Sequence, residues 1–237
     1  MHEALNSTQE RARELARAGA RHGALVVSRV QTGGRGRLGR RWGSPPGGLW
    51  MSLVLRPELD VALASRLTQA AAVGGAKALW ELGVEAKIKW PNDLLVGERK
   101  ICGVLAESSF ENVPVASKRV RPSTTSRPLD FVVLGIGLNA NLDPEDLGVT
   151  DRDVTTLRSE LGSDVEPLRL LKILLASLQT ELERIQDFEA ILDDWRALNC
   201  TLGRRVRVQK FGEILEGLAA DLSPDGALLL HTRNGTV

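Results

Sequence analysis

Hydrophobic and polar positions alternate along this chain in patterns that predict both helices and strands. Alanine-rich and leucine-rich stretches with helical periodicity predict helices at 7–20, 61–82 and 155–199. Short apolar runs predict strands at 24–30, 49–55, 86–90, 94–96, 100–106 and 131–139. Residues 109–129 are polar and contain three prolines, so we expect a mobile loop there. These elements together indicate a mixed α and β fold.

Two details refine the helix predictions. Ser7 followed by Glu10 fits a capping box, in which the two side chains satisfy free N–H groups at the start of a helix. Between Thr155 and Asn199 the pattern is helical. One apolar face of this stretch is formed by Leu168, Leu171, Leu174, Leu175 and Leu178.

From residue 200 onward the pattern changes to short alternating strands. These strands are expected at 206–208, 214–218 and 227–230, with a turn between the last two. The arrangement predicts a small β-barrel of SH3 size, which would need one more strand. We therefore divide the chain into a first domain over residues 1–199 and a second, incomplete domain over 200–237.

Composition limits the classes of protein that the chain can represent. A hydrophobic fraction of 43% can support a core, and a net charge of +1 argues against a wholly basic, nucleic-acid-binding surface. Two cysteines suggest a reducing compartment, and three histidines without a CxxC motif argue against a structural zinc site. The chain opens without a basic-then-apolar leader, and no run approaches about 18 apolar residues. We expect a cytoplasmic protein that binds neither DNA nor a membrane.

The most distinctive segment runs from Gln31 to Trp42 and is rich in arginine and glycine. Four arginines and four glycines share residues 33–42, so the segment has almost nothing apolar to bury. Glycine lets the backbone expose N–H groups, and arginine side chains present charged forks to an anion. A solvated basic loop is the plain alternative. Because the segment lies between two predicted strands, we favour a binding site for a phosphate or a carboxylate.

Three further segments contain candidate chemical groups. Residues 89–93 read Lys-Trp-Pro-Asn-Asp, where Asp93 could hold Mg²⁺, accept a proton or only bond its own turn. Lys100 begins a predicted strand, where it either protects a sheet edge or supplies a point charge for a phosphate. Gly103 and the Gly-Ile-Gly-Leu-Asn run at 135–139 place glycines inside strands, which indicates close approach of a ligand or of backbone.

In their order along the chain, these segments resemble the motifs of the biotin protein ligases. Residues 34–40 are similar to the family's GRGRxGR loop, and residues 89–93 read KWPND as in the family. Residues 99–105 resemble its RKxxGIL segment, and residues 135–139 match its GIGxN strand. Ser7 and Thr8 lie where the family has Ser-Thr-Asn, with Gln9 in place of the asparagine. Each motif alone is weak evidence, whereas their combination over nearly the whole chain is specific.

The resemblance implies a fold and a reaction. The expected fold is α+β, a mixed, mainly antiparallel sheet with helices packed on it, like the catalytic domain of class II aminoacyl-tRNA synthetases, followed by the SH3-like barrel. The expected enzyme joins biotin to ATP as biotinyl-5′-AMP, releases pyrophosphate, and transfers biotin to a lysine of a biotin carboxyl carrier protein. Mg²⁺ would accompany ATP. No helix-turn-helix precedes residue 7, so the chain resembles the ligase-only form, and a homodimer is compatible with the resemblance.

The resemblance also implies roles for individual residues. The expected catalytic residues are Arg37, Lys100 and Asp93. The expected biotin-binding residues are Ser7, Thr8, Gln31, Gly34, Arg35, Arg37, Lys100, Gly103 and Gly135. The expected nucleotide-binding residues are Arg37, Arg40, Trp42, Asn92, Lys100 and Asn139. A carboxylate and a phosphate repel each other, so cations and oriented N–H groups are needed between them.

Two other functions stay open on the sequence alone. A lipoate–protein ligase has a related fold, although its arginine loop follows a different pattern. An RGG-like arm that binds RNA would also be rich in arginine and glycine. Aromatic residues make up only 4% of the chain and tyrosine is absent, so the sequence offers no stacking platform for RNA bases.

Overall fold

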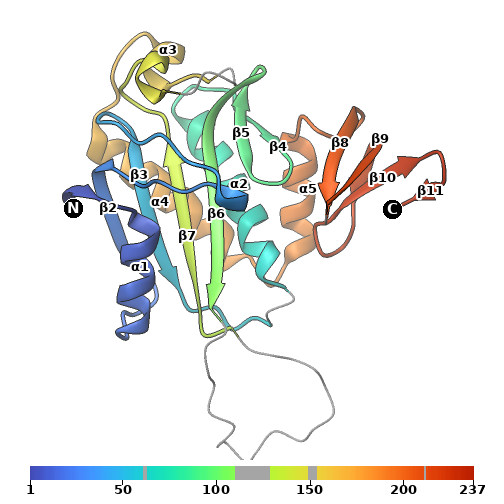
Figure 1. The fold of residues 1–237 in the computed structure, drawn as a ribbon, viewed down its shortest axis with the longest axis horizontal. Coiled ribbons are helices and arrows are strands. Elements are labelled where there is room, and N and C mark those ends of the chain that lie inside the picture. The colour runs from blue at the N-terminus through green and yellow to red at the C-terminus, as the bar shows by residue number, and fades with distance from the viewer. Residues whose placement is uncertain (61–62, 110–128, 149–153, 211) are drawn as a thin grey trace, which may run out of the picture.

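The computed structural model describes residues 1–60, 63–109, 129–148, 154–210 and 212–237. Within them, seven strands form one sheet in the order β1-β2-β3-β7-β6-β5-β4 (Figure 1). The strands are β1 His2–Leu5, β2 Ala24–Gln31, β3 Leu49–Leu55, β4 Lys87–Lys89, β5 Asp93–Val96, β6 Arg99–Ser109 and β7 Phe131–Leu138. Only β1 and β2 run parallel in this sheet of the described residues. The expected mixed, mainly antiparallel sheet is confirmed, and β1 is a strand that the pattern did not predict.

Side chains alternate between the two faces of the sheet, and each face packs against different helices (Figure 1). The described helices are α1 Thr8–Arg17, α2 Ala64–Glu81, α3 Leu157–Leu161, α4 Pro167–Glu183 and α5 Phe188–Leu198, with 3-10 helices η1 Arg37–Gly39 and η3 Pro144–Leu147. Val132 and Leu134 of β7 belong to the large core, to which α2, α4 and α5 contribute. Phe131 and Val133, the alternate residues, belong to a smaller core with Ala12 of α1. The face that α1 partly covers also bears the arginine–glycine segment.

The helical pattern predicted over 155–199 is confirmed, and the structure divides it into the three helices α3, α4 and α5. α3 ends at Gly162, whose φ of 71° is a left-handed conformation that favours glycine. Pro167 then begins α4, where its missing N–H group has no cost. The Asp187 side chain caps α5 by accepting a hydrogen bond from a backbone N–H group. Local end signals therefore outweigh the shared apolar periodicity.

One residue of the predicted leucine face points away from the core. Leu174 and Leu178 are buried, and Leu171 and Leu175 pack against the same core in part. Leu168, in the first turn of α4, is 54% exposed. The buried row instead begins at Leu170, four positions before Leu174, because residues four apart lie above one another on a helix.

A second sheet of four antiparallel strands lies beside α5 in the described residues (Figure 1). Its strands follow the order β11-β10-β9-β8. They are β8 Arg205–Lys210, β9 Glu213–Leu222, β10 Leu228–Thr232 and β11 Gly235–Thr236. Gly226, in the turn before β10, accepts hydrogen bonds from Gln69 Nε2 at 3.1 Å and Trp90 Nε1 at 3.4 Å. The expected small β-unit is therefore present, and it contacts α2 and the turn between β4 and β5.

Two sequence-based expectations concern the rest of the chain. Residues 110–128 of the expected mobile loop lie outside the described residues. None of the described helices has the length and apolar character that a membrane crossing requires.

Gly74 and Gly75 are adjacent in α2, and the structure predicts opposite effects of alanine at these positions. A Cβ atom at Gly74 would lie 3.1 Å from the backbone of Leu178 in α4, whereas one at Gly75 would meet only the end of the Leu94 side chain, at 3.0 Å. Overpacking costs about 1–3 kcal/mol, while replacing glycine in a helix gains about 1 kcal/mol. Gly74→Ala should lower the free energy of unfolding by about 1 kcal/mol, and Gly75→Ala should leave it unchanged or raise it. Urea denaturation of both variants checks this, and equal effects would contradict the packing argument.

Candidate active site

The α1 face of the large sheet carries glycines at its centre. Gly135 and Gly137 of β7 occupy alternate positions on this face, and Gly103 of β6 is paired with Gly137. A Cβ atom at Gly135 would lie 2.5 Å from Oε1 of Gln9. One at Gly137 would lie 2.4 Å from Nε1 of Trp42. At these positions the side chains of Gln9 and Trp42 occupy the space into which a Cβ atom would project, and we call this surface, formed by Gly103, Gly135 and Gly137, the glycine floor.

A buried polar cluster lies at one end of the glycine floor. Gln31 Oε1 accepts hydrogen bonds from the backbone N–H of Thr8 at 2.8 Å and from its hydroxyl at 3.0 Å. The Thr8 and Ser52 hydroxyls lie 2.9 Å apart, and Ser52 donates to Gln9 Oε1 at 3.0 Å. Gln9 Nε2 donates to the Val133 carbonyl of β7 at 2.9 Å, which fixes the orientation of the Gln9 amide.

The orientation of the Gln31 amide is fixed in the same way. Its Nε2 donates at 2.8 Å to the hydroxyl of Ser44, which itself donates to the Trp42 carbonyl at 3.2 Å. Both glutamines therefore present their oxygens to the hydroxyls of Thr8 and Ser52. Two hydroxyl hydrogens must then serve three oxygen–oxygen contacts, so the cluster has spare acceptor capacity. A ligand with N–H donors would complete it.

Ser7 adds a further unpaired oxygen beside this cluster. It precedes α1 and is 2% exposed, and its Oγ has no hydrogen-bond partner among the described residues. The predicted capping box is wrong, because the Ser7 side chain caps no N–H group and the Glu10 carboxylate instead contacts Arg35 and Asn6. A buried hydroxyl without a partner costs free energy, so its presence here is consistent with a ligand site.

Cationic groups lie at the other end of the glycine floor. Lys100 Nζ lies 2.5 Å from Asp93 Oδ1, and both side chains are largely buried. Arg37 Nη1 donates to Asn92 Oδ1 at 3.1 Å, while Asn92 Nδ2 donates to the Val104 carbonyl. Because β5 and β6 pair Asp93 with Gly103, these charges border the floor directly. Two strands and the arginine–glycine segment thus bring one lysine, one arginine and one carboxylate together.

Trp42 lies between the two ends. Its ring lies against Gly103 as well as Gly137, and it stands edge-on to Trp50 with 6.4 Å between the ring centroids and 74° between the planes. Lys100 Nζ lies 4.8 Å from its ring centroid, a cation–π contact. The Trp42 Nε1 donor has no partner among the described residues. Trp42 Nε1 is therefore a buried donor beside Gly137 that the described residues leave unpaired.

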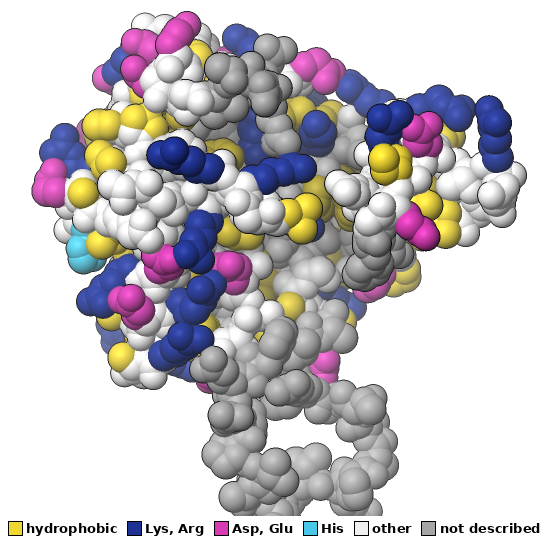
Figure 2. Space-filling model, in the orientation of Figure 1, with side chains coloured by type: hydrophobic (Ala, Val, Ile, Leu, Met, Phe, Trp, Pro, Cys, Tyr) yellow, Lys and Arg dark blue, Asp and Glu magenta, His cyan; other side chains and the backbone are white. Residues whose placement is uncertain are grey.

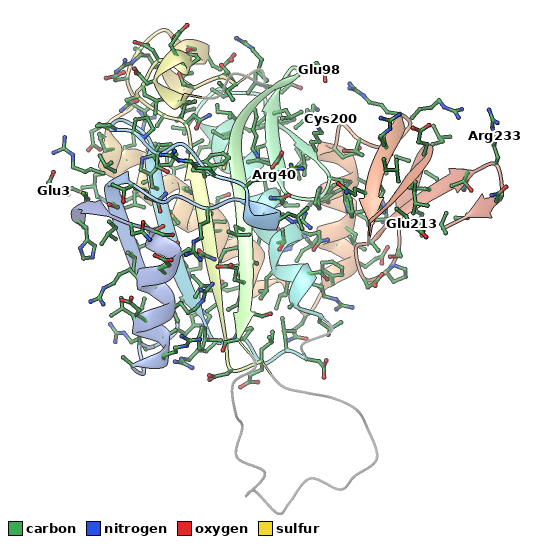
Figure 3. The ribbon with its side chains drawn as sticks, in the orientation of Figure 1. Glu3, Arg40, Glu98, Cys200, Glu213 and Arg233 are labelled. Carbon is green, nitrogen blue, oxygen red and sulfur yellow. The ribbon has the colours of Figure 1, made fainter. Side chains whose placement is uncertain are left out.

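The arginine–glycine segment is folded as a short hairpin over this face. The Trp42 N–H donates to the Gly34 carbonyl at 2.9 Å, and Arg35 and Arg41 form an antiparallel bridge. η1 forms the tip. Arg40, beside η1 in Figure 3, is exposed. Figure 2 shows basic side chains over this side of the molecule with acidic ones among them, so this face is not uniformly positive.

Asn139 and Cys102 occupy buried positions next to the site. Asn139 is 1% exposed, and its Nδ2 donates to the carbonyls of Lys100 at 3.3 Å and Thr155 at 3.1 Å. It therefore holds the end of β7 against β6, while its role toward a nucleotide stays a prediction. Burial raises the pKa of the Cys102 thiol to about 12, although the nearby Lys100 opposes this. Cys102 thus stays protonated and supplies no nucleophile.

The structure brings most of the predicted site residues together and adds others. Thr8, Gln31 and Gly135 meet at the polar end, and Arg37, Asn92, Asp93 and Lys100 meet at the cationic end. Sequence reasoning did not assign functional roles to Ser44, Ser52, Gly137 and Glu10. Ser52 had a signal, since it is a polar residue inside the apolar strand β3.

The sheet, its glycine-floored site and the small C-terminal sheet define the class of biotin and lipoate protein ligases. Residues 2–117 match the Biotin/lipoate A/B protein ligase family, and residues 201–237 match the Biotin protein ligase C terminal domain. With the relatives below, these matches show that the chain belongs to the biotin protein ligase family.

Two relatives and one solved structure illustrate the similarity. The chain is 34% identical to the bifunctional ligase/repressor BirA of Bacillus subtilis, over 99% of this chain and 69% of that protein. It is 32% identical to the biotin--[acetyl-CoA-carboxylase] ligase of Paracoccus denitrificans, over 95% of this chain and 91% of that protein. The biotin protein ligase of Aquifex aeolicus in complex with biotin and ATP superimposes with a TM-score of 0.81 at 28% identity, covering 100% of this chain and 93% of that chain.

The contact between Gln9 and the glycine floor predicts a coupled pair of substitutions. Gly135→Ala should lower the free energy of unfolding by about 2 kcal/mol, because its Cβ would overlap Gln9 Oε1. In a Gln9→Ala background, the same substitution should cost almost nothing, since the overlapping atoms are gone. A double-mutant cycle in urea measures this coupling. The same cost in both backgrounds would show that Gln9 does not lie over Gly135.

Proposed function

We propose that this protein activates biotin with ATP to give biotinyl-5′-AMP and pyrophosphate, and then transfers biotin to a lysine of a carrier protein. The observation that supports this best is the pairing of an acceptor-rich cluster with a cationic group on one glycine floor. Gly135 borders the first and Gly103, paired with Gly137, borders the second. Gly135 and Gly137 are two positions apart on β7, which corresponds to about 7 Å along the strand.

The chemistry of biotin suits the two ends. Its cyclic urea carries two N–H donors, which match the spare acceptor capacity of the Thr8 and Ser52 hydroxyls and the unpaired Ser7 Oγ. Its carboxylate would then extend toward Lys100 and Arg37. A carboxylate oxygen attacks the α-phosphorus of ATP and pyrophosphate leaves, which requires two anions to approach each other. Fixed cations at the cationic end lower this repulsion in a site with little water.

The individual roles follow from this placement and are part of the proposal. We assign biotin contacts to the residues at the polar end and along the floor, namely Ser7, Thr8, Gln31, Gly34, Arg35, Gly103 and Gly135. We assign nucleotide contacts to Arg40, Trp42, Asn92 and Asn139, and contacts with both substrates to Arg37 and Lys100. The assignment of Trp42 is supported by its place beside Lys100, whose Nζ lies 4.8 Å from the ring centroid.

Mg²⁺ is proposed to arrive with the phosphates of ATP. The described residues contain no group of three or more His, Cys, Asp or Glu side chains that could hold a metal ion. Asp93, the carboxylate at the cationic end, is paired with Lys100. Mg²⁺ commonly binds phosphates with few protein ligands, so this site fits a metal brought by the nucleotide, where it would offset phosphate charge.

Other parts of the proposal concern partners and organisation. We propose a biotin carboxyl carrier protein as the acceptor, with residues 1–199 as the catalytic domain and 200–237 as an SH3-like domain. A homodimer, the absence of DNA binding and a cytoplasmic location stay predictions from the sequence.

The Lys100→Ala variant tests the activation step. The wild-type protein should release pyrophosphate from ATP when biotin is present, and should not do so with lipoate or without an acid. Loss of the Lys100 charge should reduce this rate by about 10²- to 10³-fold, the range for removing one charged donor from a transition state. Lys87→Ala is the control, since Lys87 lies on β4 over the Trp80 ring. Near-normal release by a folded Lys100→Ala protein, or release with lipoate, would contradict the assignment.

The Asp93→Asn variant tests the transfer step. The acceptor amine has an ordinary pKa of about 10.4 and must lose a proton before it attacks the acyl carbon and AMP leaves. Asp93 at the start of β5 could take that proton, so Asp93→Asn should bind pre-formed biotinyl-5′-AMP but transfer biotin about 10²-fold more slowly. Single-turnover assays separate the two steps. Normal transfer with impaired activation would instead mean that Asp93 acts through its contact with Lys100.

A further inference from the structure

Lys89, the last residue of β4, lies in a row of residues that crosses the large sheet from the glycine floor. Lys89 is paired with Asp93 of β5, and Asp93 is paired with Gly103 of β6. Gly103 is in turn paired with Gly137 of β7. Residues that lie opposite each other in antiparallel strands project to the same face of a sheet. The row therefore begins on the glycine floor, passes the Asp93 carboxylate and ends at a lysine.

The neighbouring row shows which face of the sheet this is. It lies one position along each strand and consists of Ile88, Leu94, Cys102 and Leu138. All four are buried in the large core. Because side chains alternate along a strand, the row that contains Lys89 points to the opposite face, which carries the site. Lys89 is exposed there.

The charge of Lys89 has no close partner in the described part of the chain. Lys89 forms no hydrogen bond or ion pair there, whereas Asp93, its neighbour in the row, is paired with Lys100 at 2.5 Å. Glu98, in the turn between β5 and β6, is paired with Arg204 at 2.8 Å. The pKa of Glu98 is lowered by Arg204 first and by the more distant Lys89 charge last. The Lys89 ammonium is thus available to an anion on this face.

The place of Lys89 suits the leaving group of the activation step. In that step a carboxylate oxygen of biotin forms a bond to the α-phosphorus of ATP, and the bond from this phosphorus to pyrophosphate breaks. The attacking and leaving oxygens lie roughly in line, on opposite sides of the phosphorus. In the proposed arrangement biotin approaches from the polar end over β7, and the α-phosphate lies beside Lys100 of β6. The leaving pyrophosphate then points toward β5 and β4, where Lys89 lies.

The spacing of the strands agrees with this placement. Neighbouring strands lie about 4.8 Å apart, so the backbone of Lys89 is about 10 Å from that of Gly103 across the sheet. This distance leaves room for the β- and γ-phosphates between the two strands. A lysine carries a compact charge on a flexible four-carbon stem, and it binds phosphate as a point charge. Lys89 can therefore contact a phosphate group and still release it.

We propose that Lys89 is a further catalytic residue, which binds the β- and γ-phosphates of ATP and the pyrophosphate formed from them. This inference rests on the proposed function, from which it takes the places of biotin and the α-phosphate. The Lys89 ammonium stays protonated and transfers no proton. It offsets the charge that collects on pyrophosphate as the electron pair of the broken bond moves onto its oxygen. Lys89 takes no part in the later transfer of biotin to the carrier.

The test compares Lys89→Ala with Lys87→Ala. Lys87 lies two positions earlier on β4, and its Nζ lies 5.2 Å from the Trp80 ring centroid and 3.4 Å from Glu85, so its loss removes the same charge from the same strand. Lys89→Ala should lower kcat/KM for ATP about 10-fold, as expected for one hydrogen bond between charged groups. Lys87→Ala should match the wild type, and Lys89→Arg should retain most of the activity.

The reverse reaction and nucleotide binding provide measurements specific to the outer phosphates. With pre-formed biotinyl-5′-AMP, Lys89→Ala should raise the KM for pyrophosphate about 10-fold in the synthesis of ATP. In calorimetry the variant should bind ATP more weakly than the wild type but bind AMP equally well, because AMP lacks the β- and γ-phosphates. Single-turnover transfer from biotinyl-5′-AMP to the carrier should stay at the wild-type rate. A lysine that docks an acidic carrier would instead give slow transfer with normal ATP binding.

The outcomes separate this inference from the proposed function. If the wild type releases pyrophosphate with biotin and Lys89→Ala equals it in kcat/KM and in ATP binding, the role of Lys89 is overturned alone. Equal losses of ATP and AMP binding would also overturn it, because the contact would then not involve the outer phosphates. A wild type that binds ATP but releases no pyrophosphate with biotin would reject the proposed function, while weaker ATP binding by Lys89→Ala would still support the phosphate contact. A wild type that binds no ATP would overturn both.

Discussion

The absence of side chains at Gly103, Gly135 and Gly137 is the constraint on which the rest of this site depends. In a pleated sheet, alternate residues project from one face, and ordinary side chains there would fill the space above the strands. Glycine lets Gln9 and Trp42 lie directly over β6 and β7. The opposite face of β7 is apolar and packs in the core to which α2, α4 and α5 contribute, so the strand is held firmly from that side.

The two ends of the floor differ in chemistry, one rich in hydrogen-bond acceptors and the other in charge. At the polar end, backbone and serine partners fix the orientations of the Gln9 and Gln31 amides, so that their oxygens face the hydroxyls of Thr8 and Ser52. The cationic end pairs Lys100 with Asp93 and Arg37 with Asn92. These partners hold the cations in place without a bound anion, so the charges are already oriented when two anionic groups must meet.

Sequence reasoning found the strands and the motifs because each depends on local properties. Glycines within a β pattern at 135–139 and the arginine-rich segment at 33–42 stand out from their neighbours. The structure differs from these predictions where a side chain binds a partner that is distant in the sequence. Glu10 was expected to cap its own helix but binds Arg35, which is 25 residues away, because an ion pair to a crowded cationic hairpin outweighs a local hydrogen bond. β1 has only four residues and most of them are exposed, so it has no alternation of apolar and polar residues to read.

The sequence by itself determined which residues can form this site: the glycines that leave space, the arginines and Lys100 that supply charge, and the motif order that points to the biotin protein ligases. Only the tertiary structure decided which of them meet. The pairing of β3, β6 and β7 places Ser52, Gly103 and Gly135 on one face, although they are far apart in the chain. The surplus of hydrogen-bond acceptors at the polar end is also visible only in the tertiary structure. Hydrogen bonds between side chains depend on distance and orientation, which periodicity and composition do not contain.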